Sequence, residues 1–217
     1  EVTITAGKAT EVTAMLRRSV DTRGWLAADL HVHAGRSFDS RLQHEARVVS
    51  EVSVGVELIV ATDHNVLTDL QPDVEALGYQ DVARAIVGDE FNFAEGHGGA
   101  YPMPYFADLP FGGTEPQKLD WESVRGIRAP EIFDFIHGFP TKPVVTVNHP
   151  RLLPDLGYFT NVGWSPPLAL PAASHFDALE LLGGYAQQPP DLAALVRDWF
   201  FLLNTGHRLT ALGSSDT

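Results

Sequence analysis

The sequence predicts an α/β fold with a parallel sheet, and three observations support this class. Short apolar runs recur along most of the 217 residues, each run ends in polar residues, and helix-like segments separate several of the runs. Alternating strands and helices are typical of parallel α/β architectures, because parallel strands need a long crossover connection. The six apolar runs are the predicted strands: 25–33, 56–65, 84–91, 142–150, 175–184 and 208–216.

Three segments between these runs are predicted helices, at 40–55, 130–139 and 191–206. Their apolar residues recur with the spacing of one helix face. The first segment ends at Gly55 and the third at Gly206, and glycine is the residue type that most often follows the last turn of a helix.

Residues 1–24 lie outside this pattern. They alternate apolar and polar residues around a turn at Gly7 and Lys8, which predicts either a β ribbon beside the main domain or the tail of a preceding β-sandwich domain. We expect residues 25–217 to form the main domain. Within it, residues 91–129 interrupt the alternation with Gly, Pro and aromatic residues, and we expect a packed lid or pocket wall there.

Composition excludes several classes of function. The net charge of -13 would repel phosphate backbones, so we expect no nucleic-acid partner. The chain has no cysteine, so a bound metal would be held by His, Asp or Glu. No apolar run reaches the roughly 18 residues of a membrane span, and no signal peptide is visible. Compartment (cytoplasmic or exported) and oligomeric state stay open.

The first predicted strand ends in His31 and His33. Residues i and i+2 of a strand face the same way, with Cα atoms roughly 6.6 Å apart, so two imidazoles at this spacing can converge on one metal ion. The alternative is a pair of histidines that cap backbone groups at the end of the strand. The His-x-His pattern favours metal binding.

The later strands also end in His or carboxylate residues. His64 follows the second strand, and Glu90 ends the third, where its two oxygens can reach two cations. Asp89 is the competing carboxylate, and in a regular strand it points to the opposite face. The other candidates are His97, His149 and Asp216. Together they predict a His/carboxylate site for more than one metal ion.

These residues resemble the motifs of the polymerase and histidinol phosphatase (PHP) superfamily, and most closely its carbaryl-hydrolase-like branch (CehA/McbA-type). The motifs are DLHVH (29–33), TDHN (62–65), GDE (88–90) with GH (96–97), NHPR (148–151) and GSSD (213–216). The resemblance runs from about Trp25 to the last residue. It implies a distorted, TIM-like (β/α)7 barrel, here incomplete at its C-terminus and preceded by the short β ribbon.

The resemblance also implies two or three divalent metal ions, with Zn²⁺, Mn²⁺ and Fe²⁺ all open. The implied ligands of the first ion are His31, His33, Glu90 and Asp216. Glu90 would bridge to a second ion that His97 and His149 also hold. A third ion would use His64 and Asp39, with one further family ligand expected beyond Thr217.

The implied reaction is hydrolysis of a small-molecule ester by water that the metal ions acidify. His64 and Arg151 are the predicted catalytic residues, which steady the developing anion or protonate the leaving group. A phosphoester is the predicted substrate. A carboxylic or carbamic ester is the alternative that the branch suggests, and a non-catalytic binding module on the same scaffold is the alternative from another class.

Overall fold

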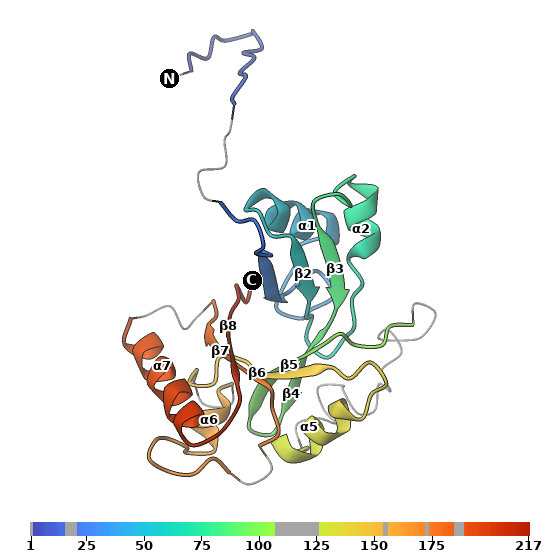
Figure 1. Ribbon diagram of the computed structural model, residues 1–217. Helices are drawn as coiled ribbons and strands as arrows, with labels where there is room; N and C mark the ends of the chain where they lie inside the picture. Colours follow the sequence, from blue (N-terminus) through green and yellow to red (C-terminus); the bar gives the residue numbers. More distant parts are fainter. Residues whose placement is uncertain (1, 16–20, 107–125, 154–155, 172–173, 185–188) are drawn as a thin grey trace.

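A computed structural model describes every residue except 1, 16–20, 107–125, 154–155, 172–173 and 185–188. Its strands form two sheets (Figure 1). The first sheet is parallel and contains β1 (Ala28–Val32), β2 (Leu58–Ala61) and β3 (Arg84–Val87), in that order. The second sheet contains β4 (Asp89–Phe93), β5 (Gly96–Tyr101), β6 (Val144–Val147), β7 (Ala178–Leu182) and β8 (Thr210–Gly213), also in chain order.

The expected (β/α)7 barrel is wrong, because the described strands form sheets of three and five strands and no closed barrel. The run 84–91, predicted as one strand, is divided at Gly88 into β3 and β4, which belong to different sheets. A Cβ at Gly88 would lie 2.9 Å from Val60 Cγ1 and 3.1 Å from the Ala100 oxygen, so this close passage between the sheets needs glycine.

The second sheet also departs from the predicted parallel pattern. β5 pairs antiparallel with both β4 and β6, whereas β6, β7 and β8 are parallel. The connection between β4 and β5 is only Ala94 and Glu95, and a connection this short permits only antiparallel pairing. The lid expected at 91–129 is therefore wrong in its first part, where Phe91 and Phe93 are buried core residues. Residues 107–125 lie outside the described part of the chain.

Backbone hydrogen bonds join the two sheets on two sides. On one side His64 and Glu90 form a parallel bridge, and the Asn65 N–H donates to the Glu90 carbonyl at 3.1 Å. On the other side the Asp216 N–H donates to the His31 carbonyl at 2.9 Å, and the His33 N–H donates to the Thr217 carbonyl at 2.8 Å. The carboxyl ends of β1 and β2 therefore face the second sheet, with the C-terminal residues beside β1 (Figure 1).

Each sheet has its own helices and its own core (Figure 1). The helices of the first sheet are α1 (His44–Ser53) and α2 (Gln71–Ala76), and those of the second are α5 (Ala129–His137), α6 (Tyr158–Asn161) and α7 (Pro189–Asn204). The three predicted helices are confirmed as α1, α5 and α7. The short helices α2 and α6 were not predicted, since fewer than two turns show no clear period.

The ribbon expected over residues 1–24 is wrong in the described residues 2–15 and 21–24, which contain no strand. The expected turn is present, because the Lys8 N–H donates to the Thr5 carbonyl at 3.2 Å. Ile4 and Met15 are 82% and 83% exposed, so these apolar side chains of the described residues lack the burial that would stabilise a two-stranded ribbon. The division of the chain into 1–24 and 25–217 stays a prediction.

Candidate metal centre

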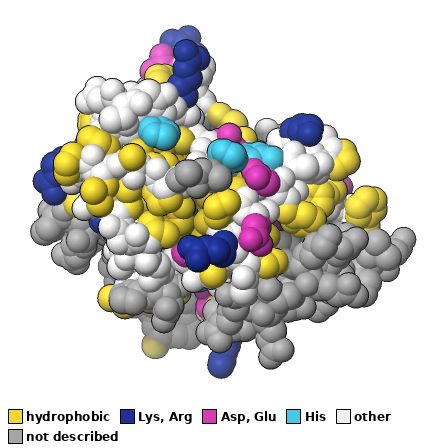
Figure 2. Space-filling view, turned by 90° about the horizontal axis from the view of Figure 1, so that it is seen from below, with side chains coloured by type: hydrophobic (Ala, Val, Ile, Leu, Met, Phe, Trp, Pro, Cys, Tyr) yellow, Lys and Arg dark blue, Asp and Glu magenta, His cyan; other side chains and the backbone are white. Residues whose placement is uncertain are grey.

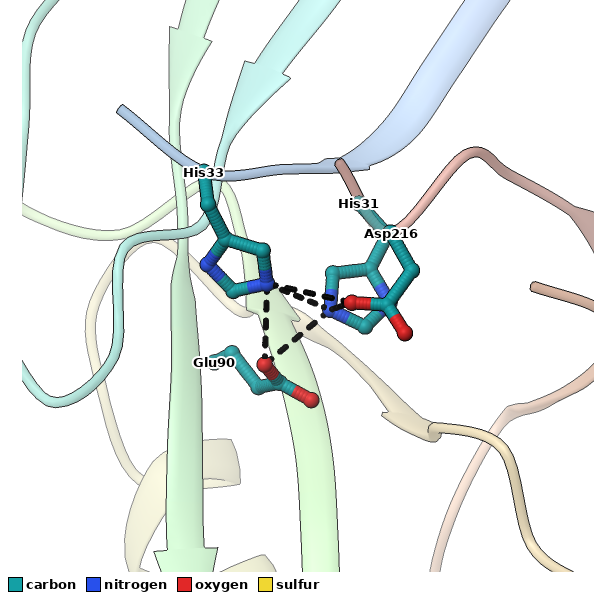
Figure 3. Close-up of side chains that lie close together, drawn as sticks. All are labelled: His31, His33, Glu90 and Asp216. Carbon is teal, nitrogen blue, oxygen red and sulfur yellow. Dashed lines mark hydrogen bonds and ion pairs between the residues drawn. The ribbon is translucent and has the colours of Figure 1, made fainter. Parts of the chain in front are cut away.

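Four side chains from three regions of the sequence meet where the two sheets join: His31, His33, Glu90 and Asp216 (Figure 3). Glu90 Oε2 lies 3.0 Å from His31 Nε2 and 3.2 Å from His33 Nε2. Asp216 Oδ1 lies 3.3 Å from both of these nitrogens. One ligand atom of each residue lies within 4.8 Å of the others, so the four residues are close enough to hold a metal ion.

Local structure explains why these side chains converge. His31 lies in β1 and His33 directly after it, so the two-residue period directs both imidazoles to one side of the strand. Glu90 lies in the regular strand β4, which directs its side chain to this cluster. Asp216 has φ of 54°, a conformation that aspartate tolerates, and its N–H is bonded to the His31 carbonyl. The predicted first ligand group is therefore brought together.

The Glu90 carboxylate lies between two sets of imidazoles. Its Oε2 faces His31, His33 and His64, with the His64 Nε2 at 3.1 Å. Its Oε1 lies 3.1 Å from His149 Nε2 and 3.4 Å from His97 Nδ1. This is the arrangement that a carboxylate bridging two cations requires.

Asp39 lies at the open side of the cluster. Its Oδ2 is 3.5 Å from His64 Nε2, and its Oδ1 is 3.9 Å from His33 Nδ1. These three residues form a further group close enough for one ion, and His64, Glu90 and His97 form another. Every predicted ligand therefore lies in or beside one continuous cluster. The other paired histidines lie elsewhere: His44 with Asp73, His137 with Asp177 and His175 with Asp134.

The ionisation of the cluster follows from its packed charges. Burial lowers the pKa of His33, but the carboxylates of Asp216 and Glu90 outweigh burial and raise that pKa from 6.5 to about 9. Burial likewise opposes the charge on His31, and Glu90 and Glu180 overcome it, so the pKa of His31 is raised well above its usual value. Burial acts to raise the pKa of Glu90. The positive charges of His31 and His64 outweigh burial and hold that pKa well below its usual value.

These residues fit a divalent cation. The imidazolium charges of His31 and His33 compensate the buried Glu90 and Asp216 carboxylates, and a cation can replace those protons because metal ligands bind deprotonated. Within the described part of the chain, Glu90 Oε2 and His97 Nδ1 are buried and make no well-aligned hydrogen bond; their contacts in the cluster are ion pairs, at 3.0 Å to His31 Nε2 and at 3.4 Å to Glu90 Oε1. Buried polar atoms without a well-aligned hydrogen bond are costly unless something else satisfies them. Imidazole and carboxylate donors suit Zn²⁺, Mn²⁺ and Fe²⁺.

Sequence reasoning missed the residues that orient the ligands. Asn92 Oδ1 lies 3.0 Å from His64 Nδ1, and Asn92 Nδ2 lies 2.9 Å from His97 Nε2. Asn148 Nδ2 donates to Glu90 Oε1 at 3.1 Å. Asn92 is two residues after Glu90 on the same strand face, so the two-residue period was a signal that could have identified it.

Arg151, a predicted catalytic residue, has other contacts. Its Nε donates to the buried Asp198 carboxylate of α7, and its Nη2 donates to the Trp164 carbonyl at 3.3 Å. Its guanidinium carbon lies 5.8 Å from the centre of the Phe159 ring. In this arrangement Arg151 holds the loop after β6 against α7 and lines a cavity of about 520 Å³ that contains none of the cluster residues.

A separate cavity of about 340 Å³ opens onto the cluster. Its polar wall is formed by Asp39, His64, Glu90, His97, His149 and Asp216. Its apolar wall is formed by Phe38, Leu152, Leu153 and Leu156. The Phe38 ring stacks on His64, with centroids 4.7 Å apart and planes at 28°. Figure 2 shows a face of the molecule on which histidine and acidic side chains lie together with hydrophobic side chains beside them.

No protein-family model matches this chain, and no curated protein matches it. Membership of the PHP superfamily therefore stays a prediction from the motifs. No described helix is both long and apolar enough to cross a membrane.

Proposed function

We propose that this protein is a metal-dependent hydrolase that cleaves the phosphoester of a small molecule. The observation that carries the proposal is the position of Glu90, which directs one oxygen toward His31, His33 and His64 and the other toward His97 and His149. A buried carboxylate between two imidazole sets fits a site for two cations. The adjoining cavity leaves room for a small substrate.

The residues that would hold the ions are those of the cluster: His31, His33, Asp39, His64, Glu90, His97, His149 and Asp216. When bound, divalent cations supply acidified water near neutral pH and a positive charge for the ester oxygen. The protein's own contribution is to orient the candidate ligands and to place a proton-carrying group beside the substrate cavity. Asn92 Oδ1 accepts from His64 Nδ1, which leaves His64 Nε2 facing the cavity, where, with no third ion bound to it, it would hold or pass a proton to a leaving oxygen.

The apolar wall favours a second candidate, a carboxylic or carbamic ester. Phe38, Leu152 and Leu153 suit an uncharged, apolar portion of a substrate, and no Lys or Arg is among the described residues that line this cavity. A phosphoester dianion would therefore depend on the metal ions alone for positive charge. Parallel assays with aryl phosphate and aryl carboxylate esters would separate the two substrate classes.

The first experiment measures the metal content of the purified chain and of His33→Ala by elemental analysis, after reconstitution with Zn²⁺, Mn²⁺ or Fe²⁺. We expect two or more equivalents in the wild type and at least one fewer in the variant, since His33 belongs to two ligand groups. His175→Ala is the matched control, because His175 pairs with the exposed Asp134. No bound metal in the wild type would overturn the hydrolase proposal and favour the non-catalytic binding module.

A further inference from the structure

A buried carboxylate outside the ligand groups touches three parts of the cluster. Glu180 lies in β7 and is 2% exposed. Its Oε1 lies 3.0 Å from His31 Nδ1 and accepts a hydrogen bond from Ser214 Oγ at 2.6 Å. Its Oε2 accepts the backbone N–H of His149 at 2.6 Å. One side chain thus contacts β1, the loop after β6 and the segment after β8.

We propose that Glu180 is a positioning residue that orients His31, His149 and the Asp216 segment for metal binding. This inference rests on the metal site of the proposed function. Glu180 is in none of the ligand groups found among the described residues, and its two oxygens are occupied by donors from the protein. It therefore acts through its neighbours.

The contact with His31 decides which ring nitrogen is available to a metal. An ionised carboxylate only accepts hydrogen bonds, so His31 Nδ1 must carry a proton where it meets Glu180 Oε1. The Nε2 atom is then the ligating nitrogen. That nitrogen faces the centre, 3.0 Å from Glu90 Oε2 and 3.3 Å from Asp216 Oδ1. Carboxylates that accept from the second nitrogen of a ligating histidine fix its tautomer and its ring orientation.

The contact with His149 stabilises an unusual backbone conformation. His149 has φ of 26°, in the region that residues other than glycine rarely adopt. Its N–H is held by Glu180 Oε2, and its Nε2 lies 3.1 Å from Glu90 Oε1. The hydrogen bond offsets the strain that brings this imidazole to the centre.

The carboxylate is also confined by its surroundings. A Cβ at Gly183 would lie 2.8 Å from Glu180 Oε2 and 2.9 Å from its Cδ, so a larger residue there would push the carboxylate out of its position. Ser214 donates to Glu180 two residues before Asp216, which ties the turn that carries this ligand to β7. A confined carboxylate with three fixed donors holds their relative positions.

The test compares zinc affinity in the wild type, Glu180→Gln and Asp177→Asn by chelator competition. Glutamine keeps the shape but replaces one acceptor oxygen by an NH₂ donor, so either the His149 N–H or the His31 and Ser214 donors lose their acceptor. We expect Glu180→Gln to weaken zinc binding about 10- to 100-fold. Asp177 is the control, because it lies just before β7 but outside the cluster. Its carboxylate accepts the Val145 N–H at 2.8 Å. The Asp177→Asn protein should have a lower melting temperature than the wild type and the same zinc affinity.

A spectroscopic readout separates positioning from general stability. Nitrogen-15 NMR of the histidines in the zinc-loaded wild type should show His31 protonated at Nδ1 and bound through Nε2, and Glu180→Gln should alter this signature while circular dichroism stays unchanged. Wild-type zinc affinity in Glu180→Gln overturns the inference and leaves the proposed function standing. Weaker zinc binding in Glu180→Gln, together with a wild type that binds zinc but hydrolyses neither ester class, supports the inference and overturns the proposed function. A wild type that binds no metal overturns both.

Discussion

At the scale of single residues, the charge balance of the cluster sets how the metal-free protein responds to pH. The pKa of His33 is raised from 6.5 to about 9 by Asp216 and Glu90 against the effect of burial. A group with a raised pKa contributes stability that is complete below its unfolded value and is lost as pH rises through its folded value. Asp89 acts in the same direction, because burial raises its pKa from 3.8 to about 8.

We therefore expect the metal-free protein to lose stability between pH 6.5 and 9. Thermal unfolding in the presence of a chelator, followed by circular dichroism across this range, measures the effect. His33→Ala should reduce the pH dependence, since it removes one of the groups whose pKa is raised in the folded state. A melting temperature that is constant or rises over this range would contradict the charge assignment.

Arg151 makes contacts that its motif does not suggest, while its catalytic role stays a prediction. It pairs with Asp198, which is 4% exposed, so Arg151→Ala would leave a buried carboxylate without its cation. We expect a loss of roughly 3 kcal/mol in the free energy of unfolding, measured in urea, and unchanged metal content. The double variant Arg151→Met with Asp198→Leu should recover much of the loss. Metal loss in Arg151→Ala at full stability would instead return Arg151 to the site.

At the scale of elements, the antiparallel strand β5 carries His97 into the centre, and its glycines make this possible. A Cβ at Gly98 would lie 2.5 Å from Phe91 Cζ and 2.7 Å from the Thr146 oxygen, whereas one at Gly126 would have nothing within 4 Å. We expect Gly98→Ala to lower the free energy of unfolding by about 1–3 kcal/mol and Gly126→Ala to leave it nearly unchanged. Equal denaturation midpoints for the two variants would show that β4 and β6 can move apart at no cost.

Most of the strands were predictable, because most of them lie in short runs of apolar and β-branched residues. The two-residue period of a strand predicted Glu90, and not Asp89, as the metal-ligating carboxylate. The structure places Glu90 in the cluster and Asp89 outside every ligand group found among the described residues. Strand β5 was missed because its sequence, Gly96–Tyr101, is half glycine and has no apolar run. It forms because both neighbouring strands pair with it.

At the scale of the whole molecule, the cluster draws its residues from both sheets. His31, His33 and His64 come from the first sheet and its loops, and Glu90, His97, His149 and Asp216 come from the second. A metal ion held by both groups would bind the folded arrangement and not the unfolded chain. Metal binding would then stabilise the contact between the sheets.

We expect zinc at 100 times its dissociation constant to add about 2.7 kcal/mol to the free energy of unfolding, with a matching rise in melting temperature. Differential scanning calorimetry with zinc and then with a chelator measures this shift. The shift should be smaller in His33→Ala and fully retained in His175→Ala. An identical melting temperature with and without zinc in the wild type would mean that no ion links the two sheets.

The sequence by itself determined what local periodicity controls: three helices, the strand runs, and the shared face of His31 and His33. Its composition limited the candidate metal ligands to side chains other than thiolates. Only the tertiary structure decided the division into two sheets, the pairing of β5, the partner of Arg151 and the contacts of Glu180. The physical reason is sequence distance. Glu180 and His31 are 149 positions apart, and their contact depends on which strands lie side by side, whereas the direction of a side chain within a strand depends only on its immediate neighbours.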